Sequence, residues 1–306
     1  MGEVDLAAVA ADWSPAPEST TGATTAWAVA AFSSLLDLPP VAAEGEELPP
    51  FWHWFGFLDH PRQDELGDDG HPAAGTFLPP IPHRRRMVAG GRLAVHRPMR
   101  VGETLRKTSS LVRREVKHGR SGAMLLVTLR HEFDRDGTGD EVLVVEEQDV
   151  VYRAQPPGTA RGTVPDEEPG PAPDPSPEAV ELFPSETLLF RFSALTHNPH
   201  RIHYDAPYAT AVEGYPGLVV HGPLLALMLA EVPRRHRAGR GLARCDYRLA
   251  RPAFAGATVR ADHLPDPAPS DGTADGGTAL RVAGGVPGAP PSITATITLD
   301  TQEHRR

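Results

Sequence analysis

Two similar ten-residue sequences occur in this chain, and this repeat restricts the possible folds more than any other feature. The first copy, RPMRVGETLR, spans Arg97–Arg106, and the second copy, RPAFAGATVR, spans Arg251–Arg260. The first Arg, the Pro, the Gly, the Thr and the final Arg match at a constant spacing of 154 positions. Solenoid repeats recur at about 20–50 residues, so the wider spacing predicts two duplicated domains in a chain of 306 residues.

Each copy of the repeat is followed by segments that predict β-strands, because they are short, β-branched or alternating, and bounded by turn residues. In the first half they read SSLVRREVKH, GAMLLVTLRHEF and EVLVVEEQDVVYR, and in the second half TVRADHL, TALRVAG and SITATITL. A helical pattern precedes the strands in each half, at residues 24–38 and 222–236. We therefore predict an α+β fold in which a curved antiparallel sheet wraps around a long helix, twice.

A proline-rich segment, residues 155–184, lies between the two halves. Its sequence, QPPGTARGTVPDEEPGPAPDPSPEAVELFP, contains acidic residues and few large apolar ones, so burial cannot stabilise one ordered conformation. We predict an N-terminal domain at residues 1–154, this linker, and a C-terminal domain at residues 185–306. A second such segment, residues 265–277, has the composition of a turn between strands.

The composition excludes several classes of protein. With 30 basic and 40 acidic residues the chain has a formal charge of -10, which argues against nucleic acid or an anionic membrane as a partner. The 29 glycines and 33 prolines argue against a helical bundle. Cys245 is the only cysteine, so a disulfide framework and a cysteine zinc site are excluded. No apolar run approaches about 18 residues, and Glu3 and Asp5 lie where a signal peptide needs positive charge. We expect a cytoplasmic protein.

Polar residues concentrate at positions 190–209, which read FRFSALTHNPHRIHYDAPYA. The segment TLLFRFSAL predicts an alternating strand, and Asp205 has the position of a helix N-cap. Three histidines are spaced three apart, as a metal-binding helical face requires, although Pro199 argues against a continuous helix. They are His197, His200 and His203. From the residues alone, a solvated loop with a helix cap, a metal site and a catalytic site all remain open.

The stretch Phe192–Asp205 resembles the MaoC-like hydratase/dehydratase family. It is most similar to the type 2 hydroxyacyl-thioester dehydratases and the mesaconyl-CoA hydratases, which carry Phe-Ser-x-Leu-Thr-x-Asn-x-His-Arg-Ile-His-Tyr-Asp. The likeness continues through residues 213–223 (EGYPGLVVHGP), and in the first half through residues 85–91 (RRMVAGG) and 146–153 (EEQDVVYR). The resemblance implies a double hotdog fold and reversible addition of water to an acyl thioester, as in acyl-CoA and fatty acid metabolism. It implies no cofactor and no metal.

The resemblance also implies roles for individual residues of the second half. His203 falls on the family's catalytic His, and Gly222 is the candidate for its oxyanion-hole amide, although a glycine there can also serve close helix–strand contact. Asn198 stands where the wider family has a catalytic Asp, and a second register places Thr196 there, so neither register supplies a carboxylate. An amide orients a water or polarises a carbonyl but does not carry a proton. We expect the first half to be non-catalytic.

Further residues are expected to contact an acyl-CoA or acyl-carrier-protein thioester, with Arg85 and Arg86 holding its phosphates. The others are Thr196, Arg201, Tyr204 and His221. The aromatic cluster at residues 51–57 lines the acyl tunnel or, as we favour, packs in the core or between domains. A hotdog thioesterase and a non-catalytic hotdog subunit are the alternative functions, and the chain is expected to be a monomer or a homodimer.

Overall fold

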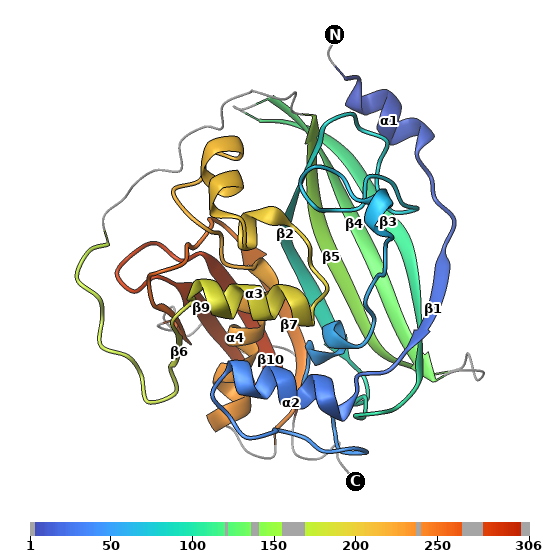
Figure 1. Cartoon of the computed structure of the whole chain (residues 1–306). Helices are drawn as coiled ribbons and strands as arrows, with labels where there is room; N and C mark the ends of the chain where they lie inside the picture. Colours follow the sequence, from blue (N-terminus) through green and yellow to red (C-terminus); the bar gives the residue numbers. More distant parts are fainter. Residues whose placement is uncertain are drawn as a thin grey trace.

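A ten-stranded antiparallel sheet forms the frame of the protein (Figure 1). The computed structural model describes residues 4–119, 122–135, 141–154, 169–236, 240–264 and 278–300. The strands of the first half are β1 (Glu18–Gly22), β2 (Arg84–Val95), β3 (Leu105–Gly119), β4 (Gly122–Arg135) and β5 (Val142–Ala154). Those of the second half are β6 (Val180–Leu182), β7 (Leu242–Leu249), β8 (Val259–His263), β9 (Thr278–Gly285) and β10 (Ile293–Leu299). The turn predicted at residues 265–277 lies outside the described residues.

Four α-helices and four short helical turns accompany the sheet in the described part of the chain. The helices are α1 (Leu6–Asp12), α2 (Ala26–Leu35), α3 (Glu186–Leu195) and α4 (Gly222–His236). The short turns are η1 (Trp52–Phe55), η2 (Gln63–Glu65), η3 (Arg201–His203) and η4 (Tyr208–Val212). None of the helices in the described ranges has the length and apolar character needed to cross a bilayer.

The two halves of the sheet have the same strand order. Across the sheet the order is β1-β3-β4-β5-β2-β7-β10-β9-β8-β6, so each half, from the centre outward, runs through its own second, fifth, fourth, third and first strands. The halves join where residues 90–94 of β2 pair antiparallel with residues 244–248 of β7. This arrangement is a double hotdog, with two copies of one sheet joined edge to edge, as predicted.

The two ten-residue repeats occupy equivalent places, joining β2 to β3 and β7 to β8. Most of each repeat forms the connection before the strand rather than the strand itself. Gly102 and Gly256 both have positive φ values, of 79° and 88°, in the region that glycine adopts most readily. The N–H of Gly102 donates to the carbonyl of Thr24, and that of Gly256 donates to the carbonyl of Pro184. The matching Gly therefore belongs to a turn that both halves use to close on the preceding segment.

Helix α4 is the central helix of the second half and has the predicted bounds, Gly222–His236. It packs on β6, β7, β8, β9 and β10, and its residues from Leu224 to Pro233 are all buried. An apolar sequence on every side of the helix is therefore explained by the sheet that surrounds it.

In the first half, the short turn η1 takes the place of a long central helix. The N–H of Leu48 donates to the carbonyl of Met99 just before η1, and the N–H of Val220 donates to the carbonyl of Ala253 just before α4, both at 2.8 Å. Pro49 and Pro50 then lead into the buried residues of η1. The first half thus has the same entry to its core, but only a single helical turn follows.

The aromatic cluster at residues 51–57 lies in the core, as favoured from the sequence. Phe51, Trp52 and Phe55 are buried. Glu146 of β5 is buried beside them, 2.8 Å from His53 Nε2, and it accepts a hydrogen bond from the indole N–H of Trp54 at 2.9 Å. Apolar packing and this buried polar cluster together hold η1 against the sheet.

Helix α3 corrects a prediction, because TLLFRFSAL is not a strand. The hydroxyl of Ser185 accepts a hydrogen bond from the N–H of Leu188 and caps the helix. The buried residues of α3 follow helical spacing and are Leu189, Phe192, Ser193 and Leu195. Helix α3 packs on α2, which lies at the corresponding place in the first half. The helix predicted at residues 24–38 therefore exists as α2, and its counterpart is α3 rather than α4.

The predicted linker is described only from residue 169 onward, and residues 155–168 lie outside the described ranges. Val180–Leu182 forms the edge strand β6, which pairs antiparallel with β8. The sheet of the second half therefore begins inside the range 155–184. A large core cluster includes Phe32 and Trp52 from the first half and Phe192 from the second, so the two halves share one core.

Candidate active site

The segment after α3 turns sharply and leads to His203. The N–H of Asn198 donates to the carbonyl of Ser193, and the Asn198 side-chain oxygen accepts from the N–H of His200 at 3.1 Å. His197 adopts a positive φ of 50°, and the Thr196 hydroxyl donates back to the carbonyl of Phe192 at 2.7 Å. Asn198 and Thr196, both predicted to act on the substrate, use these polar groups to end α3 and shape the turn.

His203 lies buried at the end of η3, with 7% of its surface exposed. Its Nδ1 is 2.7 Å from the carbonyl oxygen of Val219. A carbonyl only accepts, so Nδ1 carries the proton and Nε2 keeps its lone pair. Burial lowers the pKa of His203 to about 4, although the hydrogen bond to Val219 opposes the shift. At neutral pH this imidazole is therefore uncharged and able to accept a proton at Nε2.

His221 stacks on His203, and their rings are 3.7 Å apart at an angle of 19°. A hydrogen bond of 2.8 Å joins His221 Nε2 to the Ser193 hydroxyl of α3. Burial holds the pKa of His221 well below its usual value, and the nearby His203 and His200 add to the shift. The Nδ1 atom of His221 is buried without a hydrogen-bond partner. The structure thus brings together His203 and His221, as the sequence predicted, as two neutral stacked imidazoles.

Gly222 follows His221 directly and begins α4. The first N–H groups of a helix have no partner within it and lie at the positive end of its dipole. A Cβ atom at Gly222 would lie 2.8 Å from a methyl carbon of Leu249 on β7. Glycine therefore allows a close approach of helix and strand here.

Arg201 and Tyr204, both predicted to bind the substrate, make contacts within the loop. The Arg201 guanidinium donates to Asp205 at 2.8 Å and lies over the ring of Tyr208 at 4.1 Å. The Tyr204 hydroxyl donates to the carbonyl of Pro199 at 2.9 Å. Asp205 caps the next turn by accepting from the N–H of Tyr208, as predicted.

The basic run at the start of β2, Arg84 to Arg86, makes several contacts within the protein. Arg84 donates to the carbonyls of Pro72, Ala73 and Pro79. Arg85 forms an ion pair with Glu213, which follows η4 in the second half. The Nε atom of Arg86 is buried without a partner. Arg85 therefore links the two halves beside the η4 turn.

The sequence did not indicate that the turn at residues 69–71 of the first half lies beside this site. Asp69 Oδ2 lies 3.1 Å from His71 Nδ1, and the rings of His71 and His200 are 4.1 Å apart. The rings of His200 and His203 are 5.5 Å apart. In the sequence, Asp69-Gly70-His71 carries only a turn signal, and this signal does not reveal where the turn packs.

In the described part of the chain, His197, His200 and His203 do not form a group whose ligand atoms converge on one point. Among the described residues, the group that converges closely enough for a metal ion consists of Asp69, His71 and His200.

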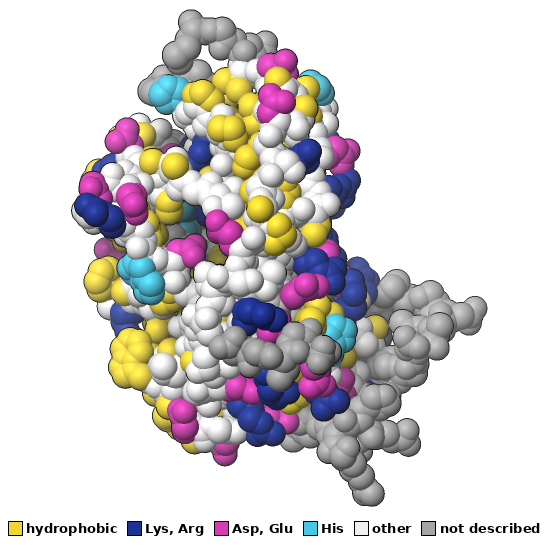
Figure 2. All heavy atoms as spheres, turned by 90° about the vertical axis from the view of Figure 1, so that its right-hand side faces the viewer, with side chains coloured by type: hydrophobic (Ala, Val, Ile, Leu, Met, Phe, Trp, Pro, Cys, Tyr) yellow, Lys and Arg dark blue, Asp and Glu magenta, His cyan; other side chains and the backbone are white. Residues whose placement is uncertain are grey.

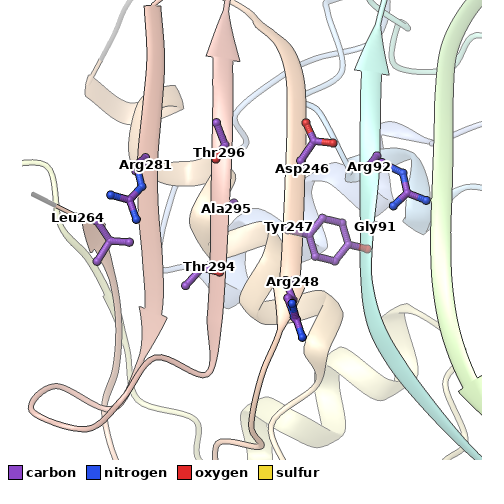
Figure 3. A pocket seen from close by; sticks show the side chains of 10 residues that line it. All are labelled: Gly91, Arg92, Asp246, Tyr247, Arg248, Leu264, Arg281, Thr294, Ala295 and Thr296. Carbon is purple, nitrogen blue, oxygen red and sulfur yellow. The ribbon is translucent and has the colours of Figure 1, made fainter. Parts of the chain in front are cut away.

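A separate hollow of about 290 Å³ lies over β2, β7, β9 and β10 (Figure 3). It faces away from α4, because Thr294 and Thr296 line it while the alternating Ile293 and Ile297 are buried. Arg92 beside it is paired with Glu147 and Asp149 at 2.8 Å. Figure 2 likewise shows basic and acidic side chains next to one another on another face of the molecule. The hollow contains none of the residues that surround His203.

The fold is that of a double hotdog protein, and its second half carries a buried, neutral histidine beside the N-terminal end of α4. Residues 51–255 match the family of hydroxyacyl-thioester dehydratase type 2. The mesaconyl-C(4)-CoA hydratase of Chloroflexus aurantiacus is 42% identical over 240 residues, which cover 75% of this chain and 79% of that protein. The chain belongs to this family of acyl-thioester hydratases and dehydratases, as the resemblance predicted.

Solved structures agree on the fold. HtdX of Mycobacterium tuberculosis has a TM-score of 0.58 at 17% identity, covering 92% of this chain and 99% of its own. A second M. tuberculosis protein, described as a double hotdog, has a TM-score of 0.54 at 14% identity, covering 94% of this chain and 96% of its own.

Proposed function

We propose that the protein adds water reversibly across the α,β double bond of an enoyl-CoA thioester, with His203 as its general base. One observation carries this proposal. His203 is buried and neutral, its Nδ1 proton is held by the carbonyl of Val219, and its Nε2 atom keeps a lone pair. A fixed imidazole of this kind supplies the proton transfers that hydration needs.

Each step of the hydration can be assigned to a group of the site. As the oxygen of a water molecule bonds to the β-carbon, one water proton passes to Nε2 of His203. The electron pair of the double bond moves toward the α-carbon and the thioester oxygen. The backbone N–H of Gly222, at the positive end of α4, stabilises the charge on that oxygen. The α-carbon then takes a proton from a donor in the site, His203 releases the water proton to solvent, and dehydration follows the reverse path.

The other residues predicted from the sequence position His203 or bind the substrate in this proposal. Asn198 and Thr196 hold the turn before His203, and stacking on His221 limits the orientations of the His203 ring. Arg86, whose Nε atom lacks a partner, is the member of the basic run that we assign to the phosphates of coenzyme A or of a carrier-protein arm.

The proposal extends to cellular context. We place the reaction in the cytoplasm and in acyl-CoA metabolism, with a mesaconyl-type thioester as the first substrate to test, given the name of the Chloroflexus relative. The two halves already complete one sheet within a single chain, so a monomer of 32.9 kDa suffices for the site.

The test is an assay of the purified protein with crotonyl-CoA and mesaconyl-CoA. Loss of enoyl absorbance without free thiol supports hydration. Release of free thiol would identify a thioesterase, and no change in either signal would identify a non-catalytic subunit. His203→Ala should lower kcat by about 10²–10⁴-fold, whereas His118→Ala, an exposed histidine of β3, should leave kcat unchanged.

A further inference from the structure

The segment that carries His203 does not provide it with a free carboxylate. Asp205 is the single acidic residue between positions 192 and 208, and its oxygens accept from Arg201 and from the N–H of Tyr208. Asn198 offers an amide whose oxygen accepts from the N–H of His200. A site made from this segment alone therefore has a neutral imidazole and no ionised partner to assist a second proton transfer.

The first half brings a carboxylate–imidazole pair to the same place. Asp69 Oδ2 lies 3.1 Å from His71 Nδ1, and Asp69 Oδ1 accepts the backbone N–H of His71 at 2.9 Å. Burial raises the pKa of Asp69, but the hydrogen bonds and charge of His71 outweigh this effect and hold the pKa below its usual value. Asp69 is therefore ionised at neutral pH and fixes the orientation of the His71 ring.

The turn that carries this pair fits closely against the loop of the second half. The N–H of Arg201 donates to the carbonyl of Asp69, and the Arg201 guanidinium donates to the carbonyl of Asp68, both at 2.9 Å. Gly70 has a φ of 92°, and a Cβ atom there would lie 1.9 Å from the carbonyl oxygen of Pro199. This contact leaves no room for a side chain at position 70, so the glycine allows the turn to pack directly against the loop at Pro199.

A row of rings connects the two halves at this point. The rings of His71 and His200 are 4.1 Å apart, and those of His200 and His203 are 5.5 Å apart. His71 is near enough to His203 for its charge to help lower the pKa of His203, after burial.

We propose that His71, oriented by Asp69, is the second proton-transfer group of the site, so that the two halves share the active site. This inference rests on the proposed hydratase function. It assigns a catalytic part to the first half, which the sequence suggested was non-catalytic.

The assignment completes the proton balance of hydration. His203 takes one proton from water as the carbon–oxygen bond forms. The imidazolium of His71 gives its proton to the α-carbon, which forms the new carbon–hydrogen bond as the thioester is restored. His203 then holds the extra proton and His71 lacks one, and transfer through His200 or solvent resets both groups. In dehydration the same groups exchange roles.

The charged and titratable groups around His71 come from three segments. Asp69 lies beside it on its own turn, the His200 ring of the second half lies 4.1 Å from its ring, and the charge of Arg84 of β2 helps to lower the pKa of Asp69. Asp69 is the group that fixes the orientation of the His71 ring, so removing its carboxylate should slow the proton transfer without weakening substrate binding.

The experiment compares His71→Gln, Asp69→Asn and His203→Ala with the wild type, using the enoyl-CoA that the wild type hydrates best. Asp64→Asn is the matched control, because Asp64 is exposed in the same part of the first half and paired with Arg62. His71→Gln should lower kcat by about 10²-fold or more with little change in KM or Tm. Asp69→Asn should also lower kcat with little change in KM, because the His71 ring loses the carboxylate that fixes its orientation. A merely structural role would lower Tm or raise KM instead.

The outcomes separate this inference from the function on which it rests. If the wild type hydrates no thioester, the proposed function fails and the inference fails with it. If the wild type is active, His203→Ala is inactive and His71→Gln keeps the wild-type kcat, only the inference is overturned. Activity that is lost with EDTA and restored by zinc would also overturn it, since Asp69, His71 and His200 would then act as metal ligands.

Discussion

Acidification should destabilise this protein through His203, by an amount that the burial of its ring determines. The pKa of His203 in the folded protein is about 4, whereas an unfolded chain gives about 6.5. Between these values the unfolded state binds more protons than the folded state, so stability rises with pH from about 4 to about 6.5 and is constant above. A difference of about 2.5 pKa units corresponds to about 3 kcal/mol, a large part of a typical domain stability of about 5–15 kcal/mol.

Urea unfolding of the wild type and of His203→Gln, between about pH 4 and pH 8 at constant ionic strength, measures this contribution. Glutamine does not titrate, and its amide still donates to a carbonyl such as that of Val219. Carboxylates titrate in both proteins and cancel in the difference. The stability of the wild type relative to His203→Gln should rise by about 3 kcal/mol between pH 4 and pH 7. A difference that stays constant over this range would show that His203 is not held neutral by burial and would refute the reasoning.

Four further substitutions test other parts of the structure. Asn198→Ala should lower the free energy of unfolding in urea by about 1 kcal/mol, because it removes the acceptor for the N–H of His200. Asn198→Asp should retain hydratase activity, and an inactive Asn198→Asp would contradict an orienting role for this side chain. Gly70→Ala should lower kcat with only a small loss in Tm, because its Cβ must displace the turn from Pro199. Unchanged kinetics would show that the position of this turn does not matter for the site. Glu146→Ala should destabilise the fold by about 3–5 kcal/mol, because His53 and Trp54 lose their buried acceptor, and calorimetry showing a wild-type Tm would argue against this.

The sequence predicted those features that depend on short-range patterns. The repeat identified the duplication because both copies form the same turn, with a glycine at positive φ in each, Gly102 and Gly256. Helix α4 was placed at its observed bounds, since an apolar run of helical length between polar segments leaves few other conformations. The order of residues around His203 and His221 brought those two side chains to one site, because both flank the same helix and loop.

Helix α3 shows where such patterns fail. Its residues alternate in polarity over a few positions, as a strand does, and they also repeat at helical spacing. Short apolar segments of this kind satisfy both periods. The cap at Ser185 and the packing against α2 select the helix; the cap is a local signal that the sequence offers, whereas the packing against α2 is not visible in a local window. In the first half, the same local reasoning did not reveal that η1 replaces a long central helix.

The tertiary structure alone determined how the first half takes part in the site. Asp69, Gly70 and His71 are about 130 positions away from the loop that they contact, and only the packing of the two halves brings them there. The same packing pairs Arg85, which the sequence assigned to substrate phosphates, with Glu213 of the second half. Backbone periodicity depends on neighbours within a few positions, so the sequence determines which elements form. Contacts between distant segments depend on how those elements pack, so the partners of each side chain follow from the tertiary structure.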